Sequence, residues 1–376
     1  MMHTYGRFDV ALVSGHGATA LDCDGREYID FTSGIGVNSL GYSDPVWVSA
    51  VAEQAAKLQH TSNLFYQPVQ TKLAETLCKL TGFSKVFFGN SGAEANECAI
   101  KLARKYGMDS YGGQHSEIVT LKNSFHGRTV TTLAATGQDE FHRNFVPLTQ
   151  GFSYAEPNME SVTEKISDKT CAVMIELIQG EGGVLALDRE FVKQLAALCK
   201  ERDILLIVDE VQTGVGRTGA LYCYRNYGIV PDVVTTAKGL GGGLPIGACL
   251  CSERLADVMG TGMHGSTFGG NPVVCAGAQA VLDRVGDVSF LTEVQEKGKL
   301  LADRLRGMKG VEEVRGMGLM LGAKPKSGNV KELAARCVES GLLVLTAKDA
   351  LRFLPPLVIS TGELEKGITI LESVLN

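Results

Sequence analysis

The chain has 376 residues, of which 44% are hydrophobic and 21% charged, and this balance is typical of a globular protein with room for two domains or one large α/β domain. Its formal net charge is −6 at pH 7. A nucleic-acid binder needs a basic face for the phosphate backbone, so this charge excludes that class and favours chemistry on small molecules.

The ten cysteines and the N-terminal residues indicate the compartment. The cysteines run from Cys23 to Cys337 with no C-x-x-C pair and no Cys/His cluster at zinc spacing, so we expect reduced, structural thiols and no metal site. Residues Met1–Arg7 lack a basic stretch followed by an apolar one, and no apolar run has membrane-spanning length. We therefore expect a cytoplasmic protein with neither a membrane nor a nucleic-acid partner.

The first part of the chain predicts a small N-terminal unit followed by two helices. Short β-type runs lie between Ala18 and Ile35, and Asp24-Gly25 between two of these runs is a hairpin signal. Asp44 is a suitable cap for a helix over Pro45–Leu58, with proline at its first position. A second helix is predicted over Val69–Leu80.

From Lys85 onward, buried strands alternate with amphipathic helices, which predicts βαβ units and a mainly parallel sheet. The predicted strands are Lys85–Phe88, Glu117–Leu121, Cys171–Leu177, Ile204–Asp209, Asp232–Thr236 and Gly247–Cys251. The predicted helices include Ala93–Tyr106, Arg189–Arg202 and Val273–Val285. After Phe290, a long helix, short strands and two further helices indicate a smaller α+β domain. We expect an N-terminal segment over residues 1–44 that joins the small domain, a large domain over 45–287 and a C-terminal small domain over 288–376.

Two neighbouring strand ends of the predicted sheet carry an acid and an amine. The apolar run Ile204–Val208 ends at Asp209, and Val233–Thr236 is followed by Lys238 and a series of glycines. Ligands of open α/β sheets sit outside the carboxyl ends of the strands, so both side chains can reach one bound molecule. A carboxylate keeps a pyridine nitrogen protonated, and a lysine with a pKa lowered by burial can form a Schiff base. This pair predicts pyridoxal phosphate as the cofactor. For each residue considered alone, the alternative is an Asp that caps the next segment and a Lys that is solvated.

A phosphate site is predicted where the strand at Phe88 turns into a helix. Ser91-x-x-Glu94 has the form of a capping box, and the backbone N–H groups of Gly92 and Ala93 at the helix start can hold an anion. The alternative is a plain capped helix.

Gly214–Gly219 matches G-x-G-x-x-G, but Asp209 and Glu210 precede it and would repel a pyrophosphate, so hydride transfer on a nicotinamide is the minor alternative.

Further side chains suit a flat cofactor and a carboxylate substrate. Phe125 follows a predicted strand and can stack on a ring, and Arg128 can grip a carboxylate, although a core Phe and a surface Arg are the alternatives. His126 has no visible partner, and we interpret it as structural. Arg352 lies in an apolar segment where a guanidinium needs an anion, and Glu181 is a candidate that an incoming carboxylate can displace.

Taken together, these motifs resemble the class III, fold-type I aminotransferases that use pyridoxal phosphate. The resemblance covers nearly the whole chain, and its motifs in this order are highly specific. It rests on Asp24–Phe31, Asn90–Glu97, Phe125–Thr129, Asp209–Gly214, Lys238-Gly239, His264–Pro272 and Val314–Leu319. It implies a large domain with a seven-stranded type of sheet and a smaller α+β domain. Tyr42 stands where relatives often have His, and the N-terminus is short, so contacts from that region stay open.

The resemblance also implies roles for individual residues. Lys238 is similar to the Schiff-base lysine that moves the proton, and Asp209 to the partner of the pyridine nitrogen. Gln212 lies near the phenolate oxygen, Gly92 and Ala93 hold the phosphate, and Phe125 covers the ring. Thr267 resembles the threonine that reaches the phosphate in a neighbouring subunit, which implies a homodimer with shared active sites. The implied substrate contacts are Arg128, Ser266, Arg352 and Glu181.

The activity that the resemblance implies is the transamination of N2-acetylornithine with 2-oxoglutarate, in arginine biosynthesis. The products would be N-acetylglutamate 5-semialdehyde and glutamate. Other amino donors stay open, namely ornithine, succinylornithine, 4-aminobutyrate or a lysine-pathway intermediate, and Gly34–Asn38 and the surroundings of Arg128 would decide among them. An aminomutase on the same cofactor and a non-catalytic binding protein are the alternatives from other classes.

Overall fold

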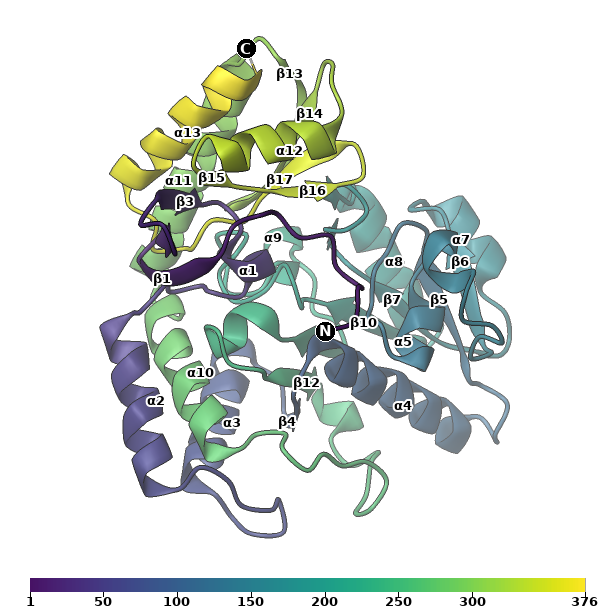
Figure 1. The fold of residues 1–376 in the computed structure, drawn as a ribbon. Coiled ribbons are helices and arrows are strands. Elements are labelled where there is room, and N and C mark those ends of the chain that lie inside the picture. Colours follow the sequence, from purple (N-terminus) through teal and green to yellow (C-terminus); the bar gives the residue numbers. More distant parts are fainter. Residues whose placement is uncertain (376) are drawn as a thin grey trace.

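A computed structural model describes residues 1–375, and Asn376, the last residue of the expected C-terminal domain, lies outside this range. A seven-stranded sheet forms the centre of the molecule, in the order β4-β12-β11-β10-β7-β5-β6 (Figure 1). Its strands are β4 (Lys85–Gly89), β5 (Glu117–Leu121), β6 (Phe152–Ala155), β7 (Thr170–Ile175), β10 (Leu205–Asp209), β11 (Val233–Thr236) and β12 (Gly247–Cys251). The prediction of an α/β fold with a mainly parallel sheet is confirmed.

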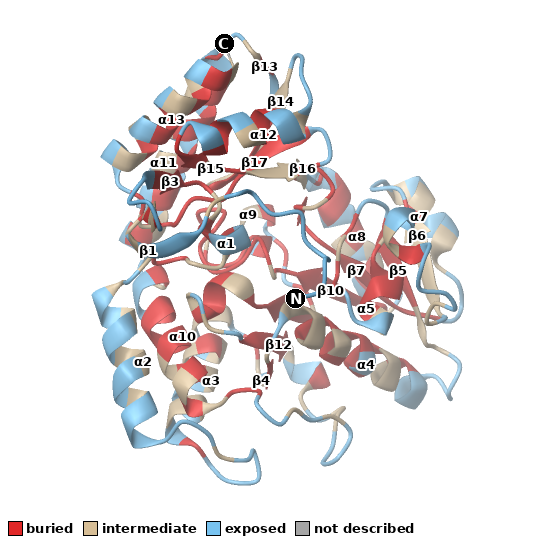
Figure 2. Ribbon diagram, viewed as in Figure 1, coloured by how far each residue is buried: buried red, intermediate tan, exposed pale blue. Residues whose placement is uncertain are grey.

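The strands of this sheet run in one direction except for β12, which is antiparallel to β11 and to β4. The sequence reasoning found six of the seven strands within a few residues. It missed β6, a four-residue edge strand that pairs only with β5 and is mostly half-buried. Such a strand lacks the long apolar run that marks β7 and β10, whose residues are all buried (Figure 2).

Helices pack on both sides of the central sheet. The longest of these is α4 (Gly92–Ser110), which packs against β12, β11, β4 and β7. The others are α1 (Ser33–Gly36), α2 (Pro45–Lys57), α3 (Pro68–Thr81), α5 (Val130–Ala135), α6 (Asp139–His142), α7 (Met159–Lys165), α8 (Arg189–Glu201), α9 (Tyr224–Tyr227) and α10 (Pro272–Val285). Asp44 caps α2 as predicted, because its carboxylate accepts a hydrogen bond from the Trp47 N–H at 2.9 Å.

Two smaller sheets and three helices lie above the large sheet in Figure 1. One sheet has the order β13-β14-β17-β16 and the other β1-β2-β3-β15. Their strands are β1 (Leu12–His16), β2 (Thr19–Asp22), β3 (Glu27–Asp30), β13 (Val311–Met317), β14 (Met320–Pro325), β15 (Leu342–Leu343), β16 (Leu345–Ala347) and β17 (Ala350–Phe353), beside the two-stranded β8 (Ile178–Gln179) and β9 (Leu185–Ala186). The helices are α11 (Val288–Gly307), α12 (Val330–Glu339) and α13 (Thr361–Leu375).

The N-terminal hairpin joins the C-terminal part of the chain through one strand pair. β2 and β3 are antiparallel across the predicted Asp24-Gly25 turn, and β15 pairs with β3 in parallel through Leu342 and Ile29. This pairing is the contact expected of an N-terminal segment that belongs to the small domain. The domain boundaries themselves stay a prediction.

Arg217 explains the G-x-G-x-x-G match that sequence reasoning set aside. Its guanidinium is buried and donates to the backbone carbonyls of Leu319 and Pro355 and to Ser33 Oγ. The segment after it forms only the four-residue α9, not a long helix with a free N-terminus. The glycine loop therefore joins three distant parts of the chain, and its buried cation is satisfied by hydrogen bonds.

Among residues 1–375, no helix is long and apolar enough to cross a membrane.

Candidate active site

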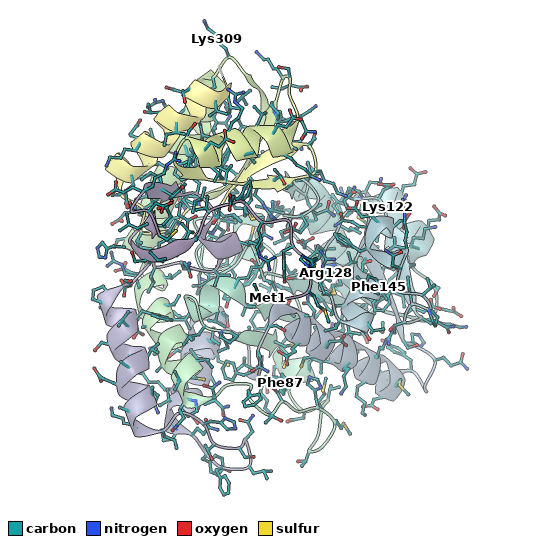
Figure 3. The ribbon with its side chains drawn as sticks, viewed as in Figure 1. Met1, Phe87, Lys122, Arg128, Phe145 and Lys309 are labelled. Carbon is teal, nitrogen blue, oxygen red and sulfur yellow. The ribbon has the colours of Figure 1, made fainter. Side chains whose placement is uncertain are left out.

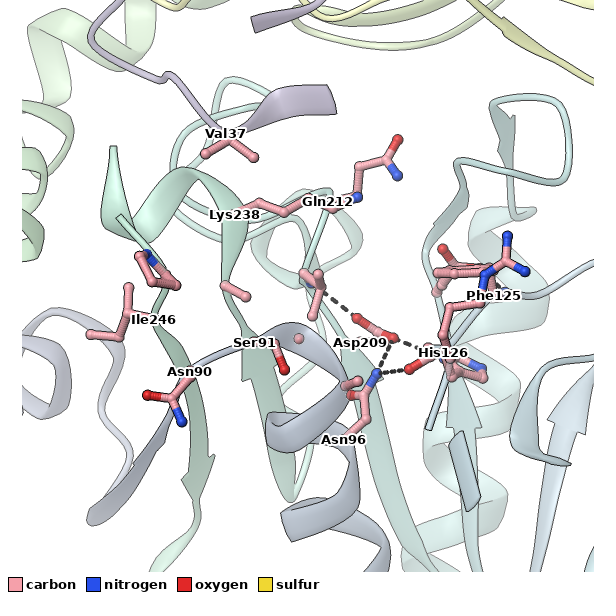
Figure 4. A pocket seen from close by; sticks show the side chains of 18 of the residues that line it. Val37, Asn90, Ser91, Asn96, Phe125, His126, Asp209, Gln212, Lys238 and Ile246 are labelled. Atoms are coloured by element: carbon pink, nitrogen blue, oxygen red, sulfur yellow. Dashed lines mark hydrogen bonds and ion pairs between the residues drawn. The ribbon is translucent and has the colours of Figure 1, made fainter. Parts of the chain in front are cut away.

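A cavity of about 430 Å³ lies at the carboxyl ends of the central strands, beside the N-terminus of α4 (Figure 4). Most of the predicted cofactor residues line it, which brings together segments that are far apart in the sequence. The lining residues include Asn90, Ser91, Gly92, Ala93, Asn96, Phe125, His126, Arg128, Glu176, Asp209, Val211, Gln212 and Lys238. Glu181, Arg352, Ser266 and Thr267 are not part of this lining.

Asp209 ends β10, and three donors hold its buried carboxylate. Oδ1 accepts from the Val211 N–H at 3.0 Å, whereas Oδ2 accepts from Asn96 Nδ2 and from His126 Nδ1, each at 2.8 Å. Thr235 on β11 fixes Asn96 in turn, because its hydroxyl donates to Asn96 Oδ1 at 2.6 Å. The carboxylate is thus held at the cavity wall as a buried, hydrogen-bonded anion.

His126 has a hydrogen-bond partner that the sequence reasoning missed. We expected a structural histidine without a partner, but its ring donates to Asp209 and lines the cavity. Its Nε2 is buried and has no hydrogen-bond partner within residues 1–375. The position of His126 just after β5 was the signal for this contact. β5 and β10 are parallel strands on either side of β7, so they end at the same edge of the sheet.

Lys238 begins a short 3₁₀ helix, η1 (Lys238–Gly241), directly after β11. Its backbone has φ of 39°, in the left-handed region that side chains rarely adopt, so this position is strained. The amine makes no hydrogen bond or ion pair with residues 1–375. Burial lowers the pKa of Lys238, and the nearby charge of Arg352 lowers it further. A lysine of this kind supplies a neutral, nucleophilic amine more readily than a solvated one.

The N-terminus of α4 presents two unpaired N–H groups to the cavity. Ser91 caps the helix by accepting from the Glu94 N–H at 3.2 Å, and Glu94 accepts in return from the Asn90 N–H at 2.6 Å. The N–H groups of Gly92 and Ala93 have no acceptor among the described residues. A Cβ at Gly92 would come within 2.6 Å of Val211 Cγ1, so only glycine brings the helix start this close to the strand end. Both donors suit an anion.

Arg352 and Glu181 form an ion pair beside Gln212. Nη1 of the buried Arg352 lies 2.6 Å from Glu181 Oε1 and 3.3 Å from Gln212 Oε1, while its Nε is buried without a partner. Burial alone would raise the pKa of Glu181, but the charge and hydrogen bond of Arg352, together with the charges of Lys238 and Arg128, outweigh burial and lower the pKa. Gln212 thus lies between the cavity and an ion pair in which the Arg352 Nε has no partner within residues 1–375.

Phe125 lies on the opposite side of the cavity from Lys238 (Figure 4), and Arg128, in the same segment after β5, also lines the cavity. The Phe125 ring makes an edge contact with Phe141 at 5.8 Å between centroids, and the Arg128 guanidinium lies 4.2 Å from the centroid of Phe141. Arg128 is exposed near the middle of the molecule in Figure 3. It is therefore held by aromatic rings while its donors stay free for a carboxylate.

Glu176 is a second residue that sequence reasoning missed. It directly follows β7, next to the end of β10, and accepts a hydrogen bond from the Phe125 N–H at 2.9 Å. Burial raises the pKa of Glu176 well above its ordinary value, and the Asp209 charge raises it further. Asp209 was predicted because it is an acid at the end of a buried strand, and Glu176 has the same position after β7. The apolar residues Leu177 and Ile178 follow Glu176, so the sequence did not show that the strand ends before it.

Ser266 and Thr267 lie outside the cavity of their own chain. Ser266 Oγ accepts from Asn90 Nδ2 at 3.2 Å and from the Gly269 N–H at 3.0 Å, and Thr267 is exposed. Within this chain, therefore, neither residue reaches the space between Asp209 and Lys238.

The groups around the cavity fit pyridoxal phosphate. Asp209 offers a held carboxylate for a pyridine nitrogen, Lys238 an unpaired amine for the aldehyde, and the start of α4 two unpaired donors for the phosphate.

Comparisons with known proteins give the same result. The family Aminotransferase class-III matches residues 1–375. The acetylornithine aminotransferase of Haemophilus ducreyi is 50% identical, over 99% of this chain and 95% of that protein. The crystal structure of N-acetylornithine aminotransferase from Stenotrophomonas maltophilia has a TM-score of 0.86 at 38% identity, with 99% of this chain and 96% of that chain covered. Ornithine aminotransferase from Toxoplasma gondii, described with PLP at its active site, has a TM-score of 0.95 at 31% identity, with 100% and 91% covered. The cofactor is pyridoxal phosphate, and the chain belongs to the class III aminotransferases.

Proposed function

We propose that the protein transfers the amino group of N2-acetylornithine to 2-oxoglutarate, giving N-acetylglutamate 5-semialdehyde and glutamate, as a step of arginine biosynthesis. The observation that carries this proposal is the single cavity that joins Lys238, Asp209 and the N-terminus of α4, with the Arg352–Glu181 pair behind Gln212. Full-length similarity to acetylornithine aminotransferases supports the choice of donor. All ten cysteines are free thiols, which suits the reducing cytoplasm as the location.

The chain supplies positioned charges and a proton carrier to this reaction. When bound, pyridoxal phosphate supplies a ring that accepts an electron pair from the substrate carbon. Asp209, held by His126 and Asn96, would keep a proton on the ring nitrogen of the bound cofactor. The amine of Lys238, whose pKa is lowered by burial, would take the proton from the substrate carbon and deliver it to the cofactor carbon that receives the amino group. The N–H groups of Gly92 and Ala93 would hold the phosphate.

The Arg352–Glu181 pair provides a way to accept two different substrates. With the pair closed, the guanidinium is neutralised, which suits the uncharged acetylamide end of a donor. 2-Oxoglutarate and glutamate bring a second carboxylate, which can replace Glu181 on Arg352 and also use the unpaired Nε. The exposed Glu181 side of the pair, 30% accessible against 4% for Arg352, is the part that moves.

Glu176 is held neutral by its surroundings. A third carboxylate charge beside Asp209 and Glu181 would be unfavourable in a buried site, and the raised pKa of Glu176 keeps its proton in place. Its unprotonated oxygen still accepts from the Phe125 N–H, so it positions the residue that covers the ring. We propose Glu176 as a neutral positioning residue.

An exposed aromatic surface supports a homodimer with shared active sites. Leu64, Phe65, Tyr66 and Phe268 are 89%, 66%, 102% and 60% exposed. The loop that carries the first three is tied to the Thr267 loop, because Asn63 Nδ2 donates to the carbonyls of Ser266 and Gly269. An apolar surface of this kind marks a protein interface, and it would bring Thr267 to a second copy of the chain.

The purified protein with its cofactor should show a visible absorption band that acetylornithine bleaches and 2-oxoglutarate restores. Lys238→Ala should lower turnover more than about 10³-fold and leave the circular dichroism spectrum unchanged, because it removes both the bond to the cofactor and the proton carrier. Lys72→Ala, an exposed lysine of α3, is the matched control and should keep full activity. A band that does not respond to either substrate would rule out transamination between them.

The donor is identified by a panel of amines assayed against 2-oxoglutarate. Acetylornithine should give the highest kcat/KM among acetylornithine, succinylornithine, ornithine and 4-aminobutyrate. A higher kcat/KM for another donor would keep the reaction class and replace the substrate. An amino shift without consumption of 2-oxoglutarate would indicate an aminomutase instead.

Arg352→Ala should raise KM for 2-oxoglutarate by about 10- to 100-fold, since a charge-assisted hydrogen bond contributes about 1.5–3 kcal/mol. KM for acetylornithine should change much less, because that donor leaves the ion pair closed. Steady-state kinetics with each substrate varied in turn measure the split. Arg306→Ala, at an exposed position of α11, is the control. Equal losses for both substrates would show that Arg352 does not discriminate between them.

Glu176→Gln should stabilise the cofactor-free protein at about pH 8 relative to wild type, with little difference below about pH 4.5. The sign follows from proton uptake: the folded-state pKa is raised, so wild-type stability is complete below the unfolded value of 4.5 and falls as the pH rises. Glutamine keeps the acceptor without the proton. Urea unfolding midpoints across this pH range measure the effect, with exposed Glu160→Gln as control. A midpoint difference independent of pH would contradict a neutral Glu176.

Leu64→Asp should convert a dimer into monomers, because a charge at the centre of an apolar interface is left without a partner. Sedimentation velocity measures the molecular mass. Val288→Asp, a similarly exposed aliphatic position at the start of α11, should leave the dimer intact. A monomeric wild-type protein with full activity would overturn the shared site.

A further inference from the structure

A second cavity, of about 220 Å³, lies farther along α4 than the active-site cavity, beside Cys98 and Leu102. It is bounded by α4, the edge strand β4, β12 and the segment after β12, and it shares no lining residue with the active-site cavity. Three of the ten cysteines line it, together with one histidine: Cys98, Cys249, Cys251 and His264. Phe87, labelled in Figure 3, forms part of its wall.

The register of the sheet places these thiols together. Cys249 and Cys251 are two residues apart on β12, so both side chains point to the same face of the sheet. This is the face that α4 covers, and Cys98 lies on α4 opposite them. Cys98 and Cys249 pack in the same hydrophobic cluster and line the same cavity. Two cysteines that are distant in sequence therefore lie at one cavity.

The surroundings of Cys98 favour its thiolate. Lys101 Nζ lies 3.0 Å from His264 Nδ1 and donates to the Met263 carbonyl at 2.8 Å, which fixes both basic groups at the cavity. The interaction with Cys249 lowers the pKa of Cys98 to about 6, against the effect of burial, and His264 and Lys101 add to the lowering. The pKa of Cys249 is raised well above its ordinary value by the same interaction. By contrast, burial raises the pKa of Cys199 in α8 to about 12.

We propose that Cys98 is a site of reversible oxidation by peroxide, with Cys249 as the thiol that resolves the product into a disulfide. The Cys98 thiolate attacks one oxygen of hydrogen peroxide, the O–O bond breaks, and hydroxide leaves, which gives a sulfenic acid. The Cys249 sulfur then attacks the Cys98 sulfur, the S–O bond breaks, and water leaves with the Cys249 proton. The two sulfurs lose two electrons in all, and peroxide takes them. A dithiol reductant reverses the change.

The site is distinct from a buried structural cysteine in three respects. The cavity has room for a molecule the size of peroxide, a second thiol lines it, and His264, which contacts Lys101, forms part of the same wall. Cys249 rather than Cys251 plays the part of the resolving thiol, because its influence on the pKa of Cys98 is the largest. The disulfide would link α4 covalently to β12, the strand next to the edge strand β4, and the start of this helix lines the active-site cavity.

The experiment treats the holoenzyme with a small excess of hydrogen peroxide, alkylates the remaining thiols and maps the peptides by mass spectrometry. We expect a Cys98–Cys249 disulfide that dithiothreitol removes. In Cys249→Ser, Cys98 should instead accumulate as a sulfenic acid that dimedone traps. Cys199→Ser, which alters a buried thiol elsewhere, should still form the disulfide. Circular dichroism and activity before oxidation confirm that each variant is folded.

A measurement on the unaltered protein completes the test. The rate at which iodoacetamide modifies Cys98 should rise through a midpoint near pH 6, because Cys249 on β12, His264 after β12 and Lys101 on α4 lower the pKa of Cys98. The other titratable groups at this cavity are Cys251 on β12 and Lys85 on β4. At neutral pH, Cys98 should react at least ~10-fold faster than Cys199. The proposal is overturned by a Cys98 that stays reduced while exposed Cys23 is oxidised, or by a disulfide to Cys251.

Discussion

The active site depends on a buried negative charge at the end of β10. A carboxylate in this position has lost its water, and it is stable because Asn96, His126 and the Val211 N–H replace that water with three hydrogen bonds. Each donor comes from a different element, since Asn96 belongs to α4, His126 follows β5, and Val211 follows β10 itself. Satisfying this one charge therefore fixes the helix and two strand ends relative to each other, and those are the elements that form the cavity.

The other charges of the site are arranged so that no cation or anion is left alone except where a ligand is expected. Arg352 is paired with Glu181, and burial raises the pKa of Glu176 well above its ordinary value. Lys238, the N–H groups at the start of α4, His126 Nε2 and Arg352 Nε all lack a partner within residues 1–375. Unpaired groups in a protein interior are unfavourable, so their concentration around one cavity indicates that a bound molecule completes them. An aldehyde and a phosphate on one planar ring meet this requirement.

Sequence reasoning reached those parts of the fold and site that have a local cause. Asp209 and Lys238 were found because each follows a short apolar run, and the Arg352–Glu181 contact because a guanidinium in an apolar segment needs an anion. What it missed depends on strand order, which a single sequence does not contain. His126 looked isolated along the chain, although β5 and β10 are separated only by β7. Glu176 was missed because apolar residues continue after it, so the end of β7 is not visible in the sequence. The edge strand β6 was missed because it is short and mostly half-buried and so has no long apolar run.

α4 links the features that the sequence left separate. Its first turn holds the donors for the phosphate, Asn96 in its second turn holds Asp209, and Cys98 faces the thiols of β12 two residues later. A helix is rigid over such a length. The proposed oxidation of Cys98 would therefore act on the same helix that holds Asp209 and carries the unpaired N–H groups of Gly92 and Ala93.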